Sequence, residues 1–442
     1  MMHLIAMVNP PTTAYGENWS NPLSRHDWLS GRFYADLART LERGCFDMMF
    51  FADALAIPED HDGNYATTVR TGGKGTIYLD PIVNITNAAA ATQHLGVGAT
   101  VSTSFLPVYH IARSLLTADH LSGGRVAWNI VTSTTDAEAR NQGHPGILPP
   151  GERYDRADAV VESVIDLWHT WDDDALKTYS DSGIFADPGK IRRAETAQQH
   201  GLSRGPLTLP PSGQGHPVLM QAGSSPRGKQ FAARWAEVVF AIADSEDSMR
   251  ALREEIRGRA EKDFGRDPSS VRVLQGVSTV VGTSDADAQR KLQALKDAID
   301  LPAALVKLQR LLHAERLDPQ ADAAEVLLAH RGATGSVGFE DMMLGMSRRR
   351  NFTVADLAIE QALNQLHPEI VGSAQSVAAE LEHLYRSGAC DGFVLFPALY
   401  QSSVEDFVNG VVPELQARGV LRRHYPLAAD GGPATLRATM GL

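Results

Sequence analysis

Residues 216–240 read HPVLMQAGSSPRGKQFAARWAEVVF, and this stretch contains the unit from which the fold is inferred. An apolar run at 218–222 is followed by Gly-Ser-Ser-Pro, then by a helical pattern, and then by a second apolar run that begins at 238. Short apolar runs that alternate with amphipathic helices are typical of parallel α/β structure. The stretch therefore predicts a strand, a helix and the next strand.

The turn inside this stretch also predicts how the helix begins. Ser225 occupies the position of an N-cap, Pro226 suits the first helical residue, and Gly223 allows a sharp turn because it has no Cβ. The first N–H groups of such a helix and its positive dipole end favour a bound anion. Taken alone, the pattern is more typical of an ordinary capped helix, so other segments have to decide whether an anion binds there.

Eight apolar runs of this kind occur along the chain, and most are apolar throughout, as expected of strands buried on both faces. Eight strand–helix units predict an α/β fold of the (β/α)8 TIM-barrel type with insertions, although an open doubly wound sheet also fits. No G-x-G-x-x-G opens a helix after the first strand, which weakens the dinucleotide-fold alternative. The predicted strands are Leu4–Val8, Met48–Ala52, Gly96–Val101, Val126–Val131, Val218–Ala222, Val238–Ile242, Val271–Val281 and Gly392–Pro397.

We interpret residues 1–442 as one barrel domain. Two intervals are too long for simple barrel connections, namely about 172–216, which is rich in Gly, Pro, Asp and Ser, and about 299–372, where glycines interrupt a helical pattern. Long insertions on a barrel commonly cover the mouth of the active site or form a subunit contact. The sequence leaves both roles open for each insertion.

The composition excludes several classes of protein. The 442 residues are 43% hydrophobic and 21% charged, and 41 Lys and Arg against 53 Asp and Glu give a formal charge of −12, which argues against a nucleic-acid binder. The two cysteines, Cys45 and Cys390, indicate no disulfide framework, and the N-terminus lacks the pattern of a signal peptide. No apolar run approaches the ~20 residues of a membrane span. We therefore expect a soluble, cytoplasmic protein without a nucleic-acid or membrane partner.

Polar residues collect where the predicted strands end, which is where a barrel of this type carries its chemistry. Asp53 follows the second run, and hydroxyl side chains follow three others at 102–104, 132–133 and 224–225. Asn129 lies inside the fourth run, where an inward-facing amide would need a partner. The set is rich in hydroxyls and amides and poor in carboxylates.

This set excludes several hydrolytic mechanisms. A glycosidase needs two carboxylates near the strand ends, and a serine hydrolase of the elbow type needs G-x-S-x-G, which is missing. The acidic run at 59–62 is interpreted as a solvated loop, so we expect no metal site. The remaining groups suit a polar ligand held by neutral hydrogen bonds and one phosphate-sized anion, so difficult chemistry would come from a cofactor.

Several long segments resemble one protein family. FDMMFFADAL at 46–55, VSTSFLPVYHIARSLLTADHLSGGRVAWNIVTS at 101–133, ERYDRADAVVESVIDLW at 152–168 and the stretch at 216–240 are similar to the bacterial luciferase-like, flavin-dependent monooxygenases. Within them the chain resembles the group of nitrilotriacetate, dibenzothiophene-sulfone and pristinamycin-synthase monooxygenases. The resemblance extends over nearly the whole chain, and it implies the same barrel that the strand count predicts.

The resemblance implies a two-component enzyme. Members of this family bind reduced FMN (FMNH2) that a separate NAD(P)H:flavin reductase supplies. They react it with O2 through a flavin C4a-hydroperoxide and oxygenate a small organic substrate, which in relatives includes xenobiotics and heterocycles. Homodimers and homotetramers are common among similar proteins.

The resemblance also implies site residues. The residues that match the family's flavin contacts are Asp53, Thr103, Asn129, Tyr154 and Ser224, with Ser225 beside them. The Gly-Ser-Ser-Pro turn would hold the FMN phosphate, and the hydroxyl of Tyr154, the first apolar residue of the helical stripe at 154–168, would donate to it. No catalytic acid or base is assigned, because the flavin carries the oxidising power.

Four residues are candidates for the substrate pocket, and the chain departs from the family near two of them. After Trp19 the family commonly has Arg-His-Pro, where this chain has Ser-Asn-Pro with Asn21, and a late Gly-His is Leu-His with His367. Phe51, at a strand end, is the fourth candidate. A further departure is Pro150, which stands where the family has a His four residues before the helix Tyr, so one flavin contact is expected to be missing.

Two rival functions fit the same barrel. A deazaflavin-dependent oxidoreductase would perform hydride transfer on a related fold, and a non-catalytic barrel would only bind flavin. The departures at Pro150 and Asn21 favour the second rival, whereas the retained polar residues argue against it.

Overall fold

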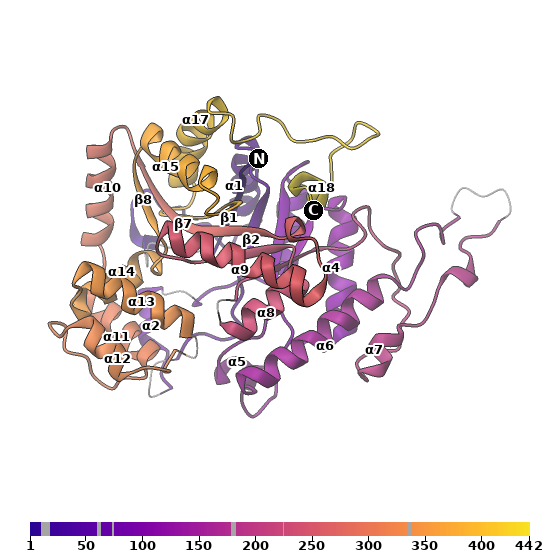
Figure 1. Ribbon diagram of the computed structural model, residues 1–442, viewed down its shortest axis with the longest axis horizontal. Helices are drawn as coiled ribbons and strands as arrows, with labels where there is room; N and C mark the ends of the chain where they lie inside the picture. Colours follow the sequence, from indigo (N-terminus) through magenta and orange to yellow (C-terminus); the bar gives the residue numbers. More distant parts are fainter. Residues whose placement is uncertain (10–17, 60–62, 73–74, 178–182, 224, 335–336) are drawn as a thin grey trace.

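The strands of the molecule close into a barrel. The computed structural model describes residues 1–442 except 10–17, 60–62, 73–74, 178–182, 224 and 335–336 (Figure 1). Each strand of the barrel is parallel to both of its neighbours, and β6 pairs with β7 to complete the ring β1-β2-β3-β4-β5-β6-β7-β9. The strands are β1 (His3–Met7), β2 (Met48–Phe51), β3 (Gly96–Ser102), β4 (Val126–Val131), β5 (Val218–Gln221), β6 (Val238–Ala241), β7 (Arg272–Gly282), β8 (Glu369–Ser373) and β9 (Gly392–Pro397).

The predicted barrel is confirmed, and the doubly wound alternative is wrong. All eight predicted strands are present, with bounds that differ from the prediction by at most one residue. The sequence analysis missed β8, which pairs with β7 at Ser278–Gly282, whereas β6 pairs with β7 only at Arg272–Gln275. The strand is short and includes Glu369, Gly372 and Ser373, so it lacks the continuous apolar run that identified the others. It extends the barrel wall at the carboxyl end of β7.

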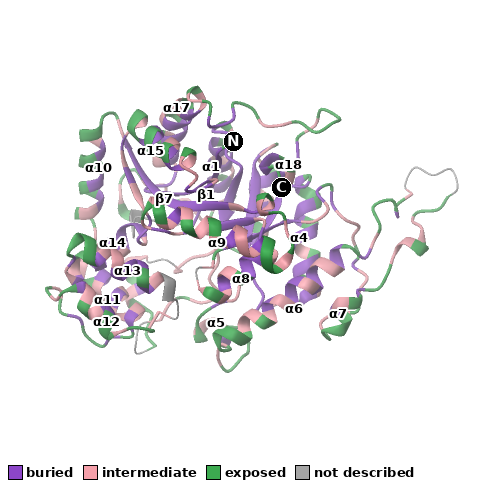
Figure 2. Cartoon of the chain, in the orientation of Figure 1, coloured by how far each residue is buried: buried purple, intermediate pink, exposed green. Residues whose placement is uncertain are grey.

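Helices surround the strands, and Figure 2 shows the strands buried while the outer faces of the helices are exposed. In the described part of the chain, no helix combines the length and apolar character needed to cross a bilayer. The helices are α1 (Gly31–Arg43), α2 (Ala66–Thr71), α3 (Pro81–Ala90), α4 (Val108–Ser122), α5 (Asp136–Asn141), α6 (Pro150–Trp168), α7 (Glu195–Gln199), α8 (Pro226–Trp235), α9 (Glu246–Phe264), α10 (Asp285–Asp297), α11 (Leu301–Leu312), α12 (Ala323–Ala329), α13 (Val337–Arg350), α14 (Val354–Asn364), α15 (Ala374–Arg386), α16 (Ser402–Asp406), α17 (Val412–Ala417) and α18 (Leu436–Met440).

Strand alternation divides the core into two layers. Side chains such as Met48 and Phe50 of β2 belong to the apolar cluster inside the barrel, whereas Met49 and Phe51 belong to the cluster between the barrel and its helices. This follows from the period of two, because successive side chains of a strand point to opposite faces. The same alternation decides which polar residues face the interior at the carboxyl ends.

The two segments predicted as insertions differ in structure. The described residues of 172–216 contain α7 and a 3-10 turn at Pro188–Lys190 and lead away from the barrel (Figure 1), and Ile184 and Phe185 on this segment are 53% and 68% exposed. Residues 299–372 contain α11 to α14, which share an apolar cluster of their own, and end with β8. The roles of the two segments remain predictions.

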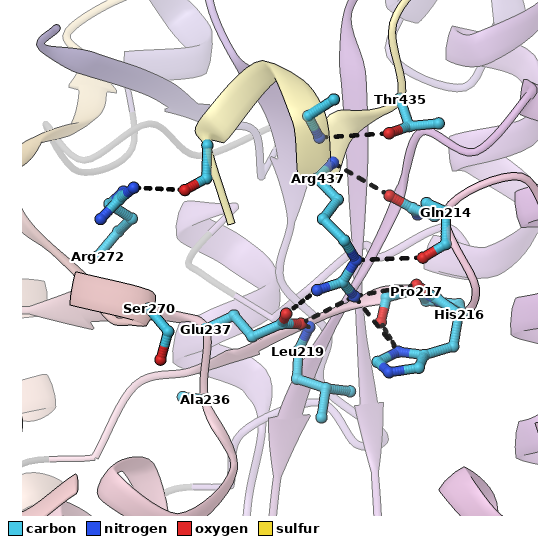
Figure 3. A network of polar contacts seen from close by, with 12 residues as sticks. Gln214, His216, Pro217, Leu219, Ala236, Glu237, Ser270, Arg272, Thr435 and Arg437 are labelled. Carbon is cyan, nitrogen blue, oxygen red and sulfur yellow. Dashed lines mark hydrogen bonds and ion pairs between the residues drawn. The ribbon is translucent and has the colours of Figure 1, made fainter. Parts of the chain in front are cut away.

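The C-terminal helix α18 packs against the amino ends of the strands (Figure 3). Its Leu436 and Met440 belong to the interior cluster of the barrel. Arg437 forms an ion pair with Glu237, and its Nε donates to the backbone oxygen of Gln214 at 3.1 Å. Glu237 in turn accepts from the backbone N–H of Leu219 on β5 at 2.9 Å. This network fixes the end of the barrel opposite to the candidate active site.

Candidate active site

A cavity of about 630 Å³ lies at the carboxyl ends of the barrel strands. Residues that follow β2, β4 and β5 line it, including Asp53, Thr132 and Ala222, and the first turns of α6 and α8 complete the wall. In parallel α/β barrels this is the end at which ligands bind. The cavity brings together four of the six predicted flavin contacts, namely Asp53, Asn129, Tyr154 and Ser225.

The first turn of α8 forms one wall of the cavity. Ser225 is its N-cap, and its side chain accepts from the backbone N–H of Gly228 at 3.0 Å, as the sequence predicted. A Cβ at Gly228 would lie 2.8 Å from the Tyr154 hydroxyl and 3.1 Å from Ser225 Oγ, so both oxygens lie directly over this turn. Helix N–H groups and two hydroxyls therefore meet at one point, which suits an anion.

The Tyr154 ring is held between two side chains of α8. Its centroid lies 5.6 Å from that of Phe231, and the guanidinium of Arg227 lies 5.4 Å from it. Arg227 is paired with Asp155 and Asp158, so carboxylates of α6 compensate its charge. Burial raises the pKa of Tyr154, which keeps the hydroxyl protonated as a hydrogen-bond donor.

Arg153 is a cation of the cavity wall that the sequence analysis did not identify. Its Nη1 donates to the backbone oxygen of Ser133, a residue in left-handed conformation with φ of 49°. Among the described residues, Arg153 forms no ion pair and its buried Nε has no hydrogen-bond partner. Burial lowers the pKa of Arg153. An unpaired guanidinium in a half-buried position indicates a site for an anionic ligand.

Asn129 places an unsatisfied oxygen in the same cavity. Its Nδ2 donates to Thr100 Oγ1 at 2.9 Å across the β3–β4 register. The side chain is 3% exposed, and in the part of the chain that the structure describes nothing donates to Asn129 Oδ1. Buried carbonyl oxygens without a donor are rare in proteins, so this atom indicates a ligand that carries an N–H or O–H group.

Asp53 is the carboxylate at the mouth of the cavity. Its Oδ1 accepts from the N–H of Ala54 at 2.9 Å, and it forms no ion pair among the described residues. Burial raises the pKa of Asp53 to about 6, and the nearby carboxylates of Asp80 and Glu138 act in the same direction. Asp53 can therefore exchange a proton near neutral pH.

A second cavity of about 760 Å³ adjoins the first, and Asp53, Thr134 and Glu138 line both. Its other walls come from the segment after β2, from α5, and from α11 and the residues after α12. The wall is mixed, because apolar residues such as Ile57 and Leu311 alternate with charged ones. A ligand that is too large for the first cavity could extend into this space.

Thr103, one of the predicted flavin contacts, does not line either cavity. Thr103 is fully buried, and its hydroxyl donates to the backbone oxygen of Val131 at 3.1 Å. Thr100, three residues earlier, lines the first cavity instead. Ser224 lies outside the described residues. A flavin contact by either Thr103 or Ser224 remains a prediction.

Two of the predicted substrate-pocket residues lie away from the cavity surface. Phe51 points outward from β2, and its ring packs 5.8 Å from that of Tyr34, whereas Phe50 lines the cavity because alternation turns it inward. The ring of His367 packs 3.8 Å from that of Phe396 and stacks on Phe240, which does line the cavity. Phe50 therefore lines the first cavity and Phe51 does not, and a substrate contact by Phe51 remains a prediction.

Trp19 and Asn21 occupy a separate surface segment. Trp19 is 39% exposed, its Nε1 donates to the backbone oxygen of Thr71 at 2.7 Å, and its ring packs against Gly72. Asn21 Oδ1 accepts from the N–H of Leu23 at 2.9 Å. Neither residue lines the two cavities. Their proximity to a substrate remains a prediction.

Pro150 is the first residue of α6 and lines the cavity where relatives were expected to carry a histidine. Proline suits this helical position because its missing N–H needs no partner. It supplies no hydrogen bond to a ligand, whereas Arg153, one turn later, does carry a free donor. Three further residues, Phe50, Thr100 and Gln221, line the cavity and were not identified by the sequence analysis. Period-two alternation within their strands could have identified the first two as inward-facing.

No cluster of metal-binding side chains was found among the described residues. The acidic run at 59–62 is partly outside them. An eight-stranded parallel barrel with a cavity at the carboxyl ends of its strands is the architecture of a (β/α)8-barrel enzyme.

The chain belongs to the luciferase-like monooxygenase family, whose family description matches residues 10–391. It is 38% identical over 100% of its length to dibenzothiophene-sulfone monooxygenase of Rhodococcus erythropolis (strain XP), with 96% of the relative covered. It is 33% identical to nitrilotriacetate monooxygenase component A of Aminobacter aminovorans, over 97% of this chain and 93% of that one. A solved structure of riboflavin lyase with modified FMN superimposes with a TM-score of 0.86 at 27% identity, covering 100% and 96% of the two chains. The enzyme class expected from the sequence, a flavin-dependent monooxygenase, is confirmed.

Proposed function

We propose that this enzyme is the oxygenase of a two-component system that binds reduced FMN from a separate flavin reductase and oxygenates a small organic substrate. One observation carries the proposal. The cavity combines a helix N-terminus, an unpaired cation at Arg153 and an unpaired buried acceptor at Asn129. These groups fit a ligand with an anionic end and a ring that carries N–H groups, as FMN does.

The anionic end is assigned to the first turn of α8. The N–H groups of that turn, the Ser225 and Tyr154 hydroxyls and the Arg153 guanidinium line one cavity. Charge-assisted hydrogen bonds to a phosphate contribute about 1.5–3 kcal/mol each. Arg153 supplies charge that Pro150 cannot, so the missing histidine does not argue against FMN.

The ring end is assigned to the interior of the barrel. Asn129 and Thr100 lie side by side there, and Met7, Phe50 and Phe240 supply apolar surface. A flat ring system buried against such surface gains the usual hydrophobic stabilisation of about 25 cal/mol per Å². Bound reduced FMN supplies the two electrons with which O2 is activated.

The chain's own contribution to the reaction is to hold the ring, exclude water and manage one proton. Asp53 lines both cavities and has a pKa of about 6, so it can hold or release a proton beside the bound ring. Residues of α11 and those after α12 line the second cavity, which supports a covering role for the 299–372 segment. We infer that this segment covers the site and limits the access of water.

The substrate is proposed to be a small, largely apolar organic molecule, of the xenobiotic or heterocyclic kind, in the second cavity. The similarity to dibenzothiophene-sulfone monooxygenase over the whole chain supports this class. The apolar residues Ile57, Ile147 and Leu311 of the cavity wall support it as well. Similarity to a component A supports a separate NAD(P)H:flavin reductase as partner. A cytoplasmic location and a homodimer or homotetramer remain predictions from the sequence.

Anaerobic titration with reduced FMN tests the cofactor proposal. We expect saturable binding, followed after O2 is admitted by the incorporation of one oxygen atom from 18O2 into a heterocyclic sulfone or a similar substrate. Reduced coenzyme F420 serves as the parallel arm, and preferential binding of it would favour the deazaflavin oxidoreductase instead. Binding of reduced FMN with only H2O2 release, for every substrate tried, would favour a non-catalytic flavin binder.

A further inference from the structure

Asn129 is a polar residue that the fold places inside an apolar barrel. Ala127, two residues earlier on β4, belongs to the interior cluster, so strand alternation turns Asn129 inward as well. Trp128 between them belongs to the outer cluster and donates from Nε1 to the backbone oxygen of Val101. The orientation of Asn129 is therefore fixed by the strand and by its neighbour.

The amide of Asn129 is fixed as well. Thr100 lies directly opposite in the parallel register of β3 and β4, and its hydroxyl accepts from Asn129 Nδ2 at 2.9 Å. With Nδ2 occupied, the buried Oδ1 is the remaining polar atom of this cavity-lining amide, and none of the described residues donates to it. Asn129 thus offers a bound ligand an acceptor and no donor.

The side chains around this oxygen do not supply the missing donor. Met7, Phe50 and Phe240 line the same part of the cavity and are apolar. Gln221, the other amide of the cavity, accepts through Oε1 from the N–H of Gly223 at 3.0 Å, and its Nε2 makes no hydrogen bond to Asn129 Oδ1. A ligand that brings its own N–H to Asn129 Oδ1 therefore gains a hydrogen bond that the protein alone does not make.

Such an acceptor distinguishes the two oxidation states of a flavin. The oxidised ring has a lone pair and no hydrogen at N5, whereas two-electron reduction places a hydrogen there. A carbonyl oxygen that faces N5 accepts a hydrogen bond from the reduced ring and meets a second acceptor in the oxidised one. A site that is built for a hydrogen bond rejects the analogue that lacks it, because the buried group is then left unpaired.

We propose, resting on the proposed function, that Asn129, held in place by Thr100, selects reduced over oxidised FMN by accepting the N5–H through Oδ1. Asn129 is then a specificity-determining residue for the redox state of the cofactor. Selection of this kind suits an enzyme that receives its flavin by diffusion, since it captures the reduced form and releases the oxidised form for another round of reduction.

The first test compares dissociation constants for both oxidation states. Reduced and oxidised FMN are titrated anaerobically into the wild-type chain, Asn129→Leu, Thr100→Val and the control Ser163→Ala. Ser163 is a buried hydroxyl on α6 that bonds to Ala159 and lines neither cavity. We expect Asn129→Leu to reduce the preference for reduced FMN about tenfold, Thr100→Val to reduce it by less, and Ser163→Ala to leave it unchanged.

The second test uses the potential of the bound flavin. Tighter binding of the reduced form raises the midpoint potential, and a tenfold change in a two-electron equilibrium corresponds to about 30 mV. The potential of bound FMN is therefore expected to fall by about 30 mV in Asn129→Leu. Reduced 5-deaza-FMN, which carries carbon at position 5, probes the same atom. The wild-type chain should bind reduced 5-deaza-FMN about tenfold more weakly than reduced FMN. Asn129→Leu should bind the two ligands equally well.

Three results would overturn the proposal. If Asn129→Leu loses affinity equally for reduced and oxidised FMN, Asn129 contacts an N–H that both forms carry. A larger loss for oxidised FMN means that the amide presents its Nδ2 to the flavin. An unchanged preference removes Asn129 from selection altogether, while the proposed function stands as long as reduced FMN binds. If the wild-type chain binds neither form, the proposed function itself fails. Should Asn129→Leu not fold, Asn129→Ser and Thr100→Val carry the test.

Discussion

Two aspartates flank strand β2 and lie in opposite environments. Asp47 precedes the strand, is fully buried, and accepts from His3, from Arg422 and from the N–H of Leu4. Burial would raise the pKa of Asp47, but the nearby charges of His3 and Arg422 outweigh it and lower the pKa. Asp53 follows the strand, has no such cation, and burial raises its pKa to about 6. Five apolar residues separate a paired carboxylate from an unpaired one.

Two arginines repeat the contrast between the ends of the barrel. Arg437 at the amino ends is ion-paired with Glu237 and also bonds to Gln214 and His216 (Figure 3). Arg153 at the carboxyl ends has no ion pair among the described residues and retains a buried Nε without a partner. Among the described residues, buried polar atoms without a partner also occur elsewhere, for example on Gln275 and Arg422, but those of Asn129 and Arg153 belong to residues that line the cavity. Their place in the cavity wall supports a ligand site at the carboxyl ends.

The largest effect is expected at the paired end. Asp47→Asn removes a charge that two cations face, and loss of one partner of a buried pair costs about 3–5 kcal/mol. The free energy of unfolding in urea at pH 7.5 should fall by that amount, while the folded fraction still binds reduced FMN with unchanged affinity. Because the folded pKa of Asp47 is lowered, the difference should shrink as the pH falls below about 4. A loss of less than about 1 kcal/mol in the free energy of unfolding would contradict the assignment of Asp47 to a buried ion pair.

The opposite change in the free energy of unfolding is expected for substitution of Asp53, which should stabilise the fold. Its folded pKa of about 6 exceeds the ordinary 3.8, so the folded chain holds a proton that the unfolded chain has released, and stability falls as pH rises through this window. Asp53→Asn removes the ionisation and should stabilise the fold by about 2 kcal/mol at pH 8 and by little at pH 4. Urea unfolding at pH 8 and at pH 4 measures the difference in the free energy of unfolding between Asp53→Asn and the wild-type chain. A pH-independent difference would mean that the carboxylate is not desolvated.

The variant Arg153→Met tests whether the unpaired guanidinium binds the phosphate of FMN. Removal of a charge-assisted hydrogen bond costs about 1.5–3 kcal/mol, so Arg153→Met should weaken binding of reduced FMN about thirtyfold. Binding of reduced riboflavin, which lacks the phosphate, should change less than about threefold by the same reasoning. Arg192→Met, which removes a surface ion pair with Asp166, is the control. Equal losses for both ligands would place Arg153 at the ring.

The smallest effect is expected at the helix cap. Ser225→Ala removes an N-cap and should cost about 1 kcal/mol of stability, together with a several-fold loss in affinity for reduced FMN. Ser245→Ala is a matched control, because Ser245 caps α9 in the same way and lines neither cavity. It should cost similar stability and leave the affinity unchanged. If both variants lose affinity alike, the α8 turn is not the phosphate site.

The sequence predicted the parts of the site that depend on local signals. The Ser-Pro start of α8 and the position of Tyr154 at the beginning of α6 follow from capping and helical periodicity. Phe51 was chosen for its place at a strand end, and the structure turns it outward and places Phe50 in the cavity. Local position identifies the end of a strand, but one residue of register decides the face.

Arg153 and β8 show a different limit. Arg153 is one of two arginines of α6, and nothing local distinguishes it from Arg156, which bonds to backbone oxygens of Thr103 and Ser104. Strand β8 lacks an apolar run and forms because the free edge of β7 is available beyond β6. The environment of Arg153 and the pairing of β8 both depend on residues that are distant in the sequence.

By itself the sequence determined the alternation of strand and helix and the caps that begin the helices, because these depend on hydrophobic periodicity and on backbone hydrogen bonds within a few residues. The closure of the strands into a barrel, which the sequence left open, was decided by the pairing of strands distant in sequence. Only the tertiary structure decided which polar groups are paired. Asp47 and Arg437 find their partners at the amino ends, whereas Asn129 and Arg153 are left with unmet bonds at the carboxyl ends. Pairing requires residues hundreds of positions apart to come within hydrogen-bonding distance, and no local pattern records that.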